Sequence, residues 1–253
     1  MILEAFRLTG KNALVTGSSR GLGAAIAVAL AEAGSNVALH GSHSVPQTVV
    51  DQVGATGARH VQLTADLRDP DCAPVLVEQT ITAFGSIDIL VNNAGMIRRS
   101  PAVDFSTEDW NDVLATNLTS AFRLCQYAGR HMLQRGSGKI INIASLLSFQ
   151  GGVTVPSYAA AKGGIAQLTK ALANEWAAEG LQVNAIAPGY METDNTEALR
   201  KDPTRSRQIM ERIPVGRWGA PRDVAGAAVF LASPASDYIN GHILTVDGGW
   251  LGR

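Results

Sequence analysis

NALVTGSSRGLGAAIAVALAEAG, residues 12–34, places an apolar run, a glycine-rich turn and a helical stretch in immediate succession. The first residues are mostly apolar and do not alternate with polar ones, which is typical of a strand buried on both faces of a sheet. The helical stretch ends at Gly34, and glycine commonly terminates helices. This order predicts the first strand–helix unit of an α/β fold.

The same alternation continues along the rest of the chain. One helical stretch ends at Gly85, one opens with Ser106 as an N-cap candidate, and one runs from Pro156 to Gly180. No linker, repeat or low-complexity segment interrupts the alternation. We therefore expect a single domain, residues 1–253, with a doubly wound, Rossmann-like sheet of seven parallel strands and helices on both faces. The other predicted strands are 36–41, 60–66, 87–95, 139–145, 181–189 and 242–249.

Segment 190–220 departs from this rhythm. It is polar and charged, and it directly follows an apolar run that ends in Pro188-Gly189. Long insertions after a strand often close over an active site. We expect a substrate lid here, and the alternative is a solvated excursion of the surface.

The composition narrows the class of protein. The chain is 46% hydrophobic and 17% charged with a net charge of −1, so it can bury a sizeable core and has no basic surplus for nucleic acid. The N-terminus, MILEAFRLTGK, does not resemble a signal peptide, and no apolar run approaches the ~20 residues of a membrane span. Cys72 and Cys125 form neither a metal-like pair nor a disulfide framework. We expect a cytoplasmic protein that binds neither membranes nor nucleic acid.

The glycine-rich turn carries the strongest local signal for a ligand. Gly17 allows a tight turn after the strand, Gly21 allows the backbone to approach a pyrophosphate, and Gly23 allows the helix to pack closely. The free N–H groups and the positive end of the helix then face the phosphates. The spacing G-x-x-x-G-x-G is a weak signal alone, but its place between a strand and a helix predicts a dinucleotide site. The alternative is a turn with a purely structural role.

The choice between NAD and NADP is usually made near the end of the second strand, where an acidic residue holds the ribose 2′-OH. Residues 39–43, LHGSH, contain no Asp or Glu. Arg20 and Ser42 are suited to hold the 2′-phosphate of NADP instead. Alternatively, Arg20 stacks on the adenine or points to solvent. The choice stays open, with a slight chemical preference for NADP.

Tyr158 and Lys162 lie four residues apart in a predicted helix, so their side chains share a face. A nearby ammonium favours tyrosinate, and we expect Lys162 to lower the pKa of the phenol enough for acid–base chemistry near neutral pH. The pair alone is a weak signal, because chance matches on helix surfaces are common. Ser145 strengthens it, since Ser145 and the turns at 92–95 and 188–189 all end predicted strands. Ligands of parallel sheets bind beyond those carboxyl ends.

Taken together, these motifs resemble those of the short-chain dehydrogenase/reductase family. T-G-x-x-x-G-x-G, Asp66-Leu67, N-N-A-G, Asn117, Ser145, Y-x-x-x-K, P-G and a late V-D-G-G occur in the family's order across essentially the whole chain. The resemblance implies an NAD(P)-dependent oxidoreductase that moves a hydride to or from a carbonyl carbon without a metal. It also implies a homotetramer formed through the helices at about 106–135 and 156–179 and the C-terminal strand.

The resemblance also implies roles for individual residues. Tyr158 would be the general acid/base, and Ser145 would orient the substrate oxygen. Lys162 would bind the nicotinamide ribose, and Asn117 would hold a water that links Lys162 to bulk solvent. Asp66 would meet the adenine amino group. The residues implied in cofactor binding are Gly17, Ser19, Arg20, Gly21, Leu22, Gly23, Ser42, Asp66, Leu67, Asn93, Ala94, Gly95, Tyr158, Lys162, Pro188, Gly189 and Thr193.

Segments that usually vary within the family, such as IASLLSFQGG and APGYMETDNT, are similar to those of its sugar-acid branch. This similarity implies a hydride transfer at C5 of a six-carbon acid such as 2-dehydro-3-deoxy-D-gluconate. A sugar-acid pocket needs a cation for the carboxylate and hydrogen-bonding groups for the hydroxyls. Arg99 is our candidate for the carboxylate, in preference to Arg98, and Gln150, Asn195 and Thr196 are candidates for the hydroxyls. The alternative for both arginines is a surface charge pair without a ligand.

Other functions remain open at this point. Gluconate 5-dehydrogenase and a generalist 3-oxoacyl or polyol reductase are the alternatives among enzymes. A non-catalytic, nucleotide-sensing scaffold is a third, but it predicts that Tyr158 or Lys162 is missing, and both are present. The absence of a strongly apolar lid argues against steroid or long acyl substrates.

Overall fold

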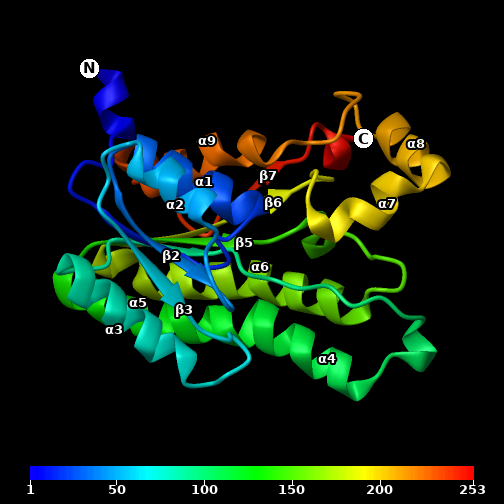
Figure 1. Cartoon of the computed structure of the whole chain (residues 1–253), viewed down its shortest axis with the longest axis horizontal. Helices are drawn as coiled ribbons and strands as arrows, with labels where there is room; N and C mark the ends of the chain where they lie inside the picture. The colour runs from blue at the N-terminus through cyan, green and yellow to red at the C-terminus, as the bar shows by residue number, and fades with distance from the viewer.

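The computed structural model describes all 253 residues and contains one seven-stranded sheet in the order β3-β2-β1-β4-β5-β6-β7. Every neighbouring pair is parallel, and all seven predicted strands are present, so the predicted doubly wound α/β fold is confirmed (Figure 1). The strand order reverses between β1 and β4, where sheets of this kind bind ligands. The strands are β1 (Asn12–Val15), β2 (Asn36–Gly41), β3 (His60–Thr64), β4 (Ile89–Asn92), β5 (Gly138–Ile143), β6 (Leu181–Pro188) and β7 (Ile243–Val246).

Helices cover both faces of the sheet, as Figure 1 shows. Helices α1, α2 and α9 pack on one face; α3, α5 and α6 pack on the other, with α4 beside α6. None of the helices has the length and apolar character needed to cross a bilayer. The α-helices are α1 (Gly21–Glu32), α2 (Gln47–Gly54), α3 (Cys72–Phe84), α4 (Thr107–Leu114), α5 (Ser120–Arg135), α6 (Pro156–Trp176), α7 (Glu197–Lys201), α8 (Pro203–Arg212) and α9 (Pro221–Ala232).

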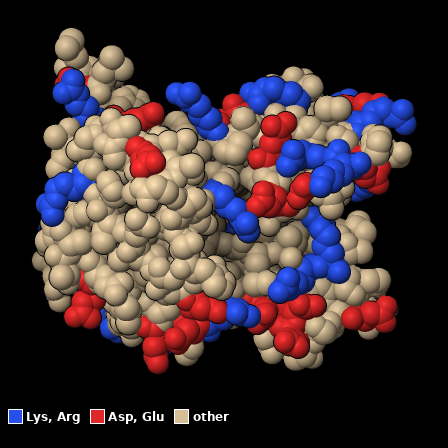
Figure 2. All heavy atoms as spheres, viewed as in Figure 1, with Lys and Arg blue, Asp and Glu red and all other residues tan.

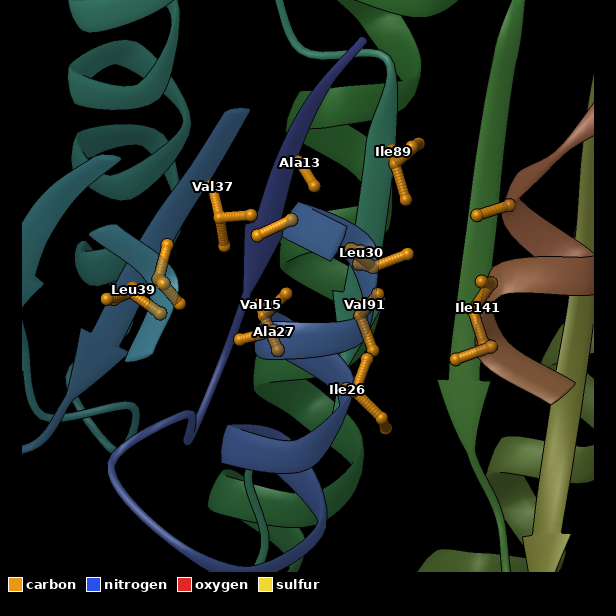
Figure 3. Packing of buried hydrophobic residues seen from close by; sticks show 14 of the residues in the cluster. Ala13, Val15, Ile26, Ala27, Leu30, Val37, Leu39, Ile89, Val91 and Ile141 are labelled. Carbon is orange, nitrogen blue, oxygen red and sulfur yellow. The ribbon is translucent and has the colours of Figure 1, made fainter. Parts of the chain in front are cut away.

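The apolar runs of the central strands supply a core on each side of the sheet. In β1, Ala13 and Val15 pack with Ile26 and Leu30 of α1, whereas Leu14 belongs to the core on the opposite face. Figure 3 shows the first of these cores, with α1 lying against the strands. Successive residues of a strand point to opposite faces, so a strand covered on both sides needs an apolar residue at every position. This geometry explains the consecutive apolar residues Ala13, Leu14 and Val15; Asn12 at the start of the strand is polar and is hydrogen-bonded through its side chain.

The two edge strands are more exposed than their apolar runs suggest. Only Leu63 is buried in β3, and no residue of β7 is buried. Each of these strands pairs on one side only. The position of a strand in the sheet, which its own run of residues does not encode, decides how much of it is covered.

The predicted helix ends are largely confirmed. The Ser106 hydroxyl caps α4 by accepting a hydrogen bond from the N–H of Asp109 at 3.0 Å, and Pro156 is the first residue of α6. Gly180 takes the left-handed conformation after the last turn. The single helix expected from Ser106 onward is instead α4 and α5, joined by a π-helical turn, Ala115–Thr119. Helices α2 and α9 are additional to those that the sequence predicted.

The excursion predicted as a lid leaves the sheet after β6 and returns at a parallel bridge between Met191 and Gly219. Its polar sequence folds into α7 and α8 rather than an irregular loop. One side of the excursion is apolar and is fixed to the body of the protein through a small separate core. The buried residues of this small core are Leu146, Ile209, Ile213, Trp218 and Trp250.

Candidate active site

A cavity of about 460 Å³ lies at the carboxyl ends of the strands around the point where their order reverses. Only seven of the 25 residues that line it are hydrophobic, so it suits a polar ligand. The face shown in Figure 2 is hollowed near its centre, and charged side chains of both signs gather to the right of the hollow. The predicted cofactor residues that line the cavity are Gly17, Ser19, Arg20, Gly21, Leu22, Gly23, Ser42, Asp66, Leu67, Asn93, Ala94, Gly95, Tyr158, Lys162 and Thr193.

Two predicted cofactor residues, Pro188 and Gly189, do not line the cavity. Pro188 ends β6, and the N–H of Gly189 donates to the carbonyl of Val246 in β7 at 2.9 Å. A Cβ on Gly189 would lie 2.7 Å from the Cα of Asp247, so glycine lets the turns after β6 and β7 approach closely. The pair lies at the predicted edge of the sheet, but its contacts are packing contacts between neighbouring strands.

The glycine turn is closed by contacts between its own backbone and Asn93. Gly17 has φ +62°, which glycine adopts without strain. A Cβ on Gly23 would collide with the carbonyl oxygen of Gly17 and with Nδ2 of Asn93. Asn93 Nδ2 donates to the carbonyls of Thr16 and Gly17 at 2.9 and 3.0 Å. The close approach predicted at Gly23 is therefore present, but it is made to the turn and to Asn93 rather than to the strand.

Basic and polar groups line the region where NAD and NADP differ. Ser42 Oγ and His43 Nδ1 are 3.0 Å apart on the loop after β2, and no acidic residue lies at the end of that strand. Arg20 Nη1 lies 3.0 Å from Asp194 Oδ2, so this exposed ion pair joins the glycine turn to the 3₁₀ turn Asp194–Thr196. All four side chains belong to residues that line the cavity.

Asp66, which the family resemblance assigns to the adenine, lines the cavity with its carboxylate paired to Arg68 at 2.7 Å. Hydrogen bonds from Arg68 lower the pKa of the Asp66 carboxyl and keep it ionised. Arg68 also lies 3.2 Å from Asp112 of α4. This line of charges holds the loop after β3 against α4.

Tyr158 and Lys162 line the cavity, and Ser145 lies beside Tyr158 just outside the lining residues, so the three come together as predicted. Tyr158 and Lys162 lie in the first two turns of α6, and Ser145 follows β5 directly. The Ser145 side chain lies beside the Tyr158 phenol. Burial raises the pKa of the phenol, while Ser145 and the positive charge of Arg99 act in the opposite direction. Lys162 Nζ lies 5.6 Å from the centre of the Tyr158 ring.

The effect of Lys162 on Tyr158 differs from the prediction. Its buried Nζ donates to the carbonyl of Ile143, at the end of β5, at 2.5 Å. Burial lowers the pKa of Lys162 to about 8, because the ammonium loses its hydration. The charge that lowers the pKa of the phenol comes from Arg99 and not from Lys162. The predicted acidification of Tyr158 by Lys162 is therefore not found in this structure, because the buried ammonium is itself destabilised.

Asn117 is buried in the π-helical turn between α4 and α5. Its Oδ1 accepts a hydrogen bond from the Met96 N–H at 2.8 Å, and its Nδ2 donates to the Met96 carbonyl at 2.9 Å. Turns of this kind are frequent at functional sites. Here the Asn117 amide anchors the loop after β4. The family resemblance assigned Asn117 only the binding of a water and did not predict this contact.

Of the two arginines considered for a carboxylate, Arg99 is the one that acts on Tyr158. Its Nη2 donates to the backbone carbonyl of Asn195 at 3.4 Å, so it bridges the loop after β4 and the start of segment 190–220. Asn195 and Arg98 line the cavity, but Arg98 Nε is paired with Asp109 of α4 at 3.0 Å. Arg99 does not line the cavity, but it is the arginine whose positive charge acts on the pKa of Tyr158.

Gln150 was predicted to bind substrate hydroxyls, but it does not line the cavity. Its Oε1 accepts a hydrogen bond from Trp250 Nε1 at 3.2 Å, which ties it to the C-terminal segment. The link joins residues far apart in the chain, so the local sequence gave no sign of it. Other lining residues were not predicted as cofactor or substrate ligands; the polar ones are His40, His43, Arg68, Thr116 and Asp194.

The residues present fit a dinucleotide. The residue that caps α1, Arg20, makes no side-chain hydrogen bond to the helix, so the first N–H groups of α1 remain available beside the bare glycine turn. Phosphates are the ligands that such a helix N-terminus favours. No group of three or more His, Cys, Asp or Glu side chains is arranged to hold a metal ion.

Comparisons with known proteins agree with this geometry. A family model described as enoyl-(acyl carrier protein) reductase matches residues 17–251. The 2-dehydro-3-deoxy-D-gluconate 5-dehydrogenase of Escherichia coli K12 is 54% identical over 255 residues and 100% of both chains. That of Bacillus subtilis 168 is 55% identical over 258 residues, covering 99% of this chain and 98% of its own. A solved gluconate 5-dehydrogenase from Burkholderia cenocepacia J2315, in complex with NADP and tartrate, is 40% identical over 100% of both chains, with a TM-score of 0.94.

Proposed function

The chain belongs to the short-chain dehydrogenase/reductase family of NAD(P)-dependent oxidoreductases, and from this premise we propose that it interconverts the keto and hydroxy forms of a six-carbon sugar acid at C5. The substrate we propose is 2-dehydro-3-deoxy-D-gluconate, because relatives more than half identical along the whole chain bear that name. Gluconate is the second candidate, because the B. cenocepacia enzyme of similar fold is a gluconate 5-dehydrogenase.

The position of Arg99 relative to the hydroxyl pair carries the proposal. Tyr158 and Ser145 offer two neighbouring hydroxyls for a single carbonyl oxygen. The guanidinium of Arg99 is near enough to lower the pKa of Tyr158 and is held by the backbone of Asn195. A substrate with a carboxylate a few carbons from its carbonyl would reach from the hydroxyls to Arg99, beside the lined cavity, whose polar walls suit its hydroxyls.

The residues of the chain act on the proton and on the substrate oxygen. In reduction, Ser145 donates a hydrogen bond to the carbonyl oxygen and Tyr158 transfers its proton to it. The nicotinamide, when bound, supplies the hydride in this direction and accepts it in the other. Tyr158 then regains a proton by way of Lys162, whose pKa of about 8 lets it exchange protons near neutral pH. In oxidation, Tyr158 removes the proton of the substrate hydroxyl.

The cofactor that we propose is NADP in preference to NAD. The glycine turn and the N-terminus of α1 would hold the phosphates, Asn93 would line the adenine ribose, and Lys162 would hold the nicotinamide ribose. The absence of an acid at the end of β2 supports NADP, as does the presence of Arg20 and Ser42 in the cavity wall. The B. cenocepacia relative was solved with NADP.

A panel of initial rates tests the function. The purified protein is assayed with NADP and NAD on 2-dehydro-3-deoxy-D-gluconate, gluconate and an acetoacetyl thioester. We expect the highest kcat/KM on the first substrate with NADP. A higher kcat/KM on the thioester would overturn the sugar-acid proposal in favour of an acyl reductase, and no activity on any substrate would favour a nucleotide-binding scaffold.

Replacing Arg99 with glutamine is expected to raise the KM for the sugar acid by about 10- to 100-fold, the usual cost of a lost hydrogen bond to a charged group. The Kd for NADPH is expected to stay unchanged, because Arg99 does not line the cofactor cavity. Steady-state kinetics measure the first effect and fluorescence titration the second.

Arg98→Gln is the matched control for this experiment. Arg98 directly precedes Arg99 in the sequence but is paired with Asp109. Its replacement is therefore expected to change the KM for the sugar acid by less than about threefold. A larger effect of Arg98→Gln than of Arg99→Gln would mean that the carboxylate is bound by the other arginine.

We propose that the segment 190–220 acts as a lid over the substrate. Two contacts join its start to the cavity walls: Arg20 with Asp194, and Arg99 with the carbonyl of Asn195. Its far end is fixed by the small core that contains Trp218. Movement is therefore expected near 193–205 rather than throughout the segment.

We also propose a homotetramer located in the cytoplasm. Trp110 of α4 and Phe122 of α5 are 37% and 41% exposed, and one edge of β7 is unpaired, so these predicted contact elements present surface to another copy. Light scattering is expected to give four times the chain mass of 26.6 kDa, and a monomer at micromolar concentration would contradict the proposal. The two cysteines are buried free thiols, which suits a reducing compartment.

A further inference from the structure

His40 is a buried residue of the cavity wall with no part in the reaction proposed above. It lies in β2 with 2% of its surface exposed. The N–H of Gly17 donates to its Nδ1 at 3.1 Å, and its Nε2 lies 3.1 Å from the carbonyl of Ala65. Because β2 lies between β1 and β3, this one side chain joins the glycine turn after β1 to the residue that precedes Asp66.

These partners define the protonation state of the imidazole. A backbone N–H only donates, so Nδ1 carries a lone pair; a carbonyl only accepts, so Nε2 carries the proton. His40 is therefore neutral when both bonds are made. Burial lowers the pKa of His40 below its usual value, and the bond to Ala65 acts in the opposite direction. A second proton would sit on Nδ1, facing the Gly17 N–H, and would break that bond.

The backbone of His40 also holds the glycine turn, at Ser18, the residue after Gly17. The Ser18 N–H donates to the His40 carbonyl at 2.8 Å, and the His40 N–H donates to the Ser18 hydroxyl at 2.8 Å. Gly17 itself is attached to β2 only through the imidazole. The side chain therefore holds the first of the two glycines at which the turn takes a positive φ.

We propose that His40 is a positioning residue for the dinucleotide, whose neutral imidazole fixes the glycine turn against the end of β3 and so sets the width of that half of the cavity. This proposal depends on the proposed function only in one respect, namely that the cavity binds NAD(P). Without the imidazole, Gly17 and Ala65 lose their shared partner. The turn then has to be ordered when the cofactor binds, which weakens binding.

Direct cofactor binding tests the proposal. We expect His40→Leu, which removes both hydrogen bonds, to raise the Kd for NADPH at least about tenfold in a fluorescence titration without substrate. The KM for the cofactor is expected to rise while kcat at saturating cofactor stays within about twofold, because the reaction end of the cavity is untouched. A Kd within twofold of wild type would overturn the proposal. The titration measures binding without turnover, so its result is valid even if the protein shows no activity on sugar acids.

Val37→Ala is the matched control, because Val37 is a fully buried residue of the same strand that belongs to the core against α1 and does not line the cavity. It is expected to lower the melting temperature without changing the Kd for NADPH more than twofold. An equal rise in Kd in Val37→Ala would show that any destabilisation of β2 weakens binding, and the proposal would fail.

Two conservative variants keep the test decisive if His40→Leu does not fold. Asparagine places an acceptor where Nδ1 stands and keeps the bond from Gly17, whereas glutamine places a donor near Nε2 and keeps the bond to Ala65. The Gly17 bond acts on the turn itself, so we expect the Kd for NADPH to be lower in His40→Asn than in His40→Gln. The same Kd in wild type and both variants would contradict the assigned role.

The pH dependence of binding supplies a readout that a purely structural role would not move. The titratable and charged groups that line the cavity beside His40 are Arg20 of the glycine turn, His43 after β2, and Asp66 and Arg68 after β3. All of these remain in His40→Asn. Because burial lowers the pKa of His40, we expect the Kd for NADPH to rise more steeply in wild type than in His40→Asn only once the pH falls below the usual histidine range. Parallel profiles would remove His40 from the control of binding.

Discussion

Replacing Tyr158 with phenylalanine is expected to lower kcat by about 10²- to 10⁴-fold, the contribution of a positioned acid–base group. The substitution removes only the phenol oxygen, so the ring beside Lys162 and the walls of the cavity persist. The Kd for NADPH is therefore expected to stay within about twofold of wild type. Stopped-flow or steady-state rates and a fluorescence titration measure the two quantities.

Tyr127→Phe is the control for the removal of a phenol oxygen elsewhere. Tyr127 lies on α5 between the guanidinium groups of Arg123 and Arg130, away from the cavity. Its substitution is expected to leave kcat unchanged. Comparable turnover in Tyr158→Phe and wild type would rule out the acid–base role and with it the reaction we propose.

The same phenol predicts how the two directions of the reaction depend on pH. Because burial raises the pKa of Tyr158, the phenol is protonated at neutral pH and is ready to donate in reduction. Oxidation needs the phenolate, so its rate in wild type is expected to increase as pH rises toward that pKa. The opposite slopes would show that another group transfers the proton.

Gly23→Ala is the second substitution with a large expected effect. The new methyl group would collide with the carbonyl of Gly17 and the amide of Asn93, which are bonded to each other at 3.0 Å. The Gly17 carbonyl is a backbone group and cannot rotate away as a flexible side chain can, so the whole turn must shift. We expect the Kd for NADPH to rise about 100-fold or more and the free energy of unfolding to fall by about 1–3 kcal/mol.

Gly226→Ala is the matched control, since Gly226 lies in α9 and a Cβ there would meet nothing within 4 Å. Alanine favours a helix interior over glycine by about 0.5–1 kcal/mol. This variant is expected to melt at a slightly higher temperature with an unchanged Kd for NADPH. If Gly23→Ala bound NADPH as wild type does, the glycine turn would not be the phosphate site.

The strands, the main helices and the edge of the sheet that carries the site follow from local signals. An apolar run such as NALV marks a strand covered on both faces, and Gly180 and Ser106 mark helix ends through their own backbone chemistry. Ser145, Tyr158 and Lys162 were predicted together because two of them share a helix face and the third ends a strand. None of these inferences needs a distant partner.

Helices α2, α7 and α8 were not predicted, because short or polar helices owe their stability to packing against other elements more than to their own sequence. Helix α9 was also missed, although it is 12 residues long and largely apolar. In α8, the side chain of Ile209 is buried against Trp218 and Trp250, which lie outside that helix. The half-exposure of β3 likewise depends on its place at the edge of the sheet.

The sequence by itself determined the α/β fold, the seven strands, the glycine turn and the group of Tyr158, Lys162 and Ser145, because strand patterns, turns and helix faces are encoded over a few neighbouring residues. The tertiary structure alone decided which side chains meet across the sheet. It placed His40 between Gly17 and Ala65, and it buried the Tyr158 phenol so that its pKa rises rather than falls. Such contacts join residues tens of positions apart, and burial and hydrogen-bond partners at those positions exist only once the chain has folded.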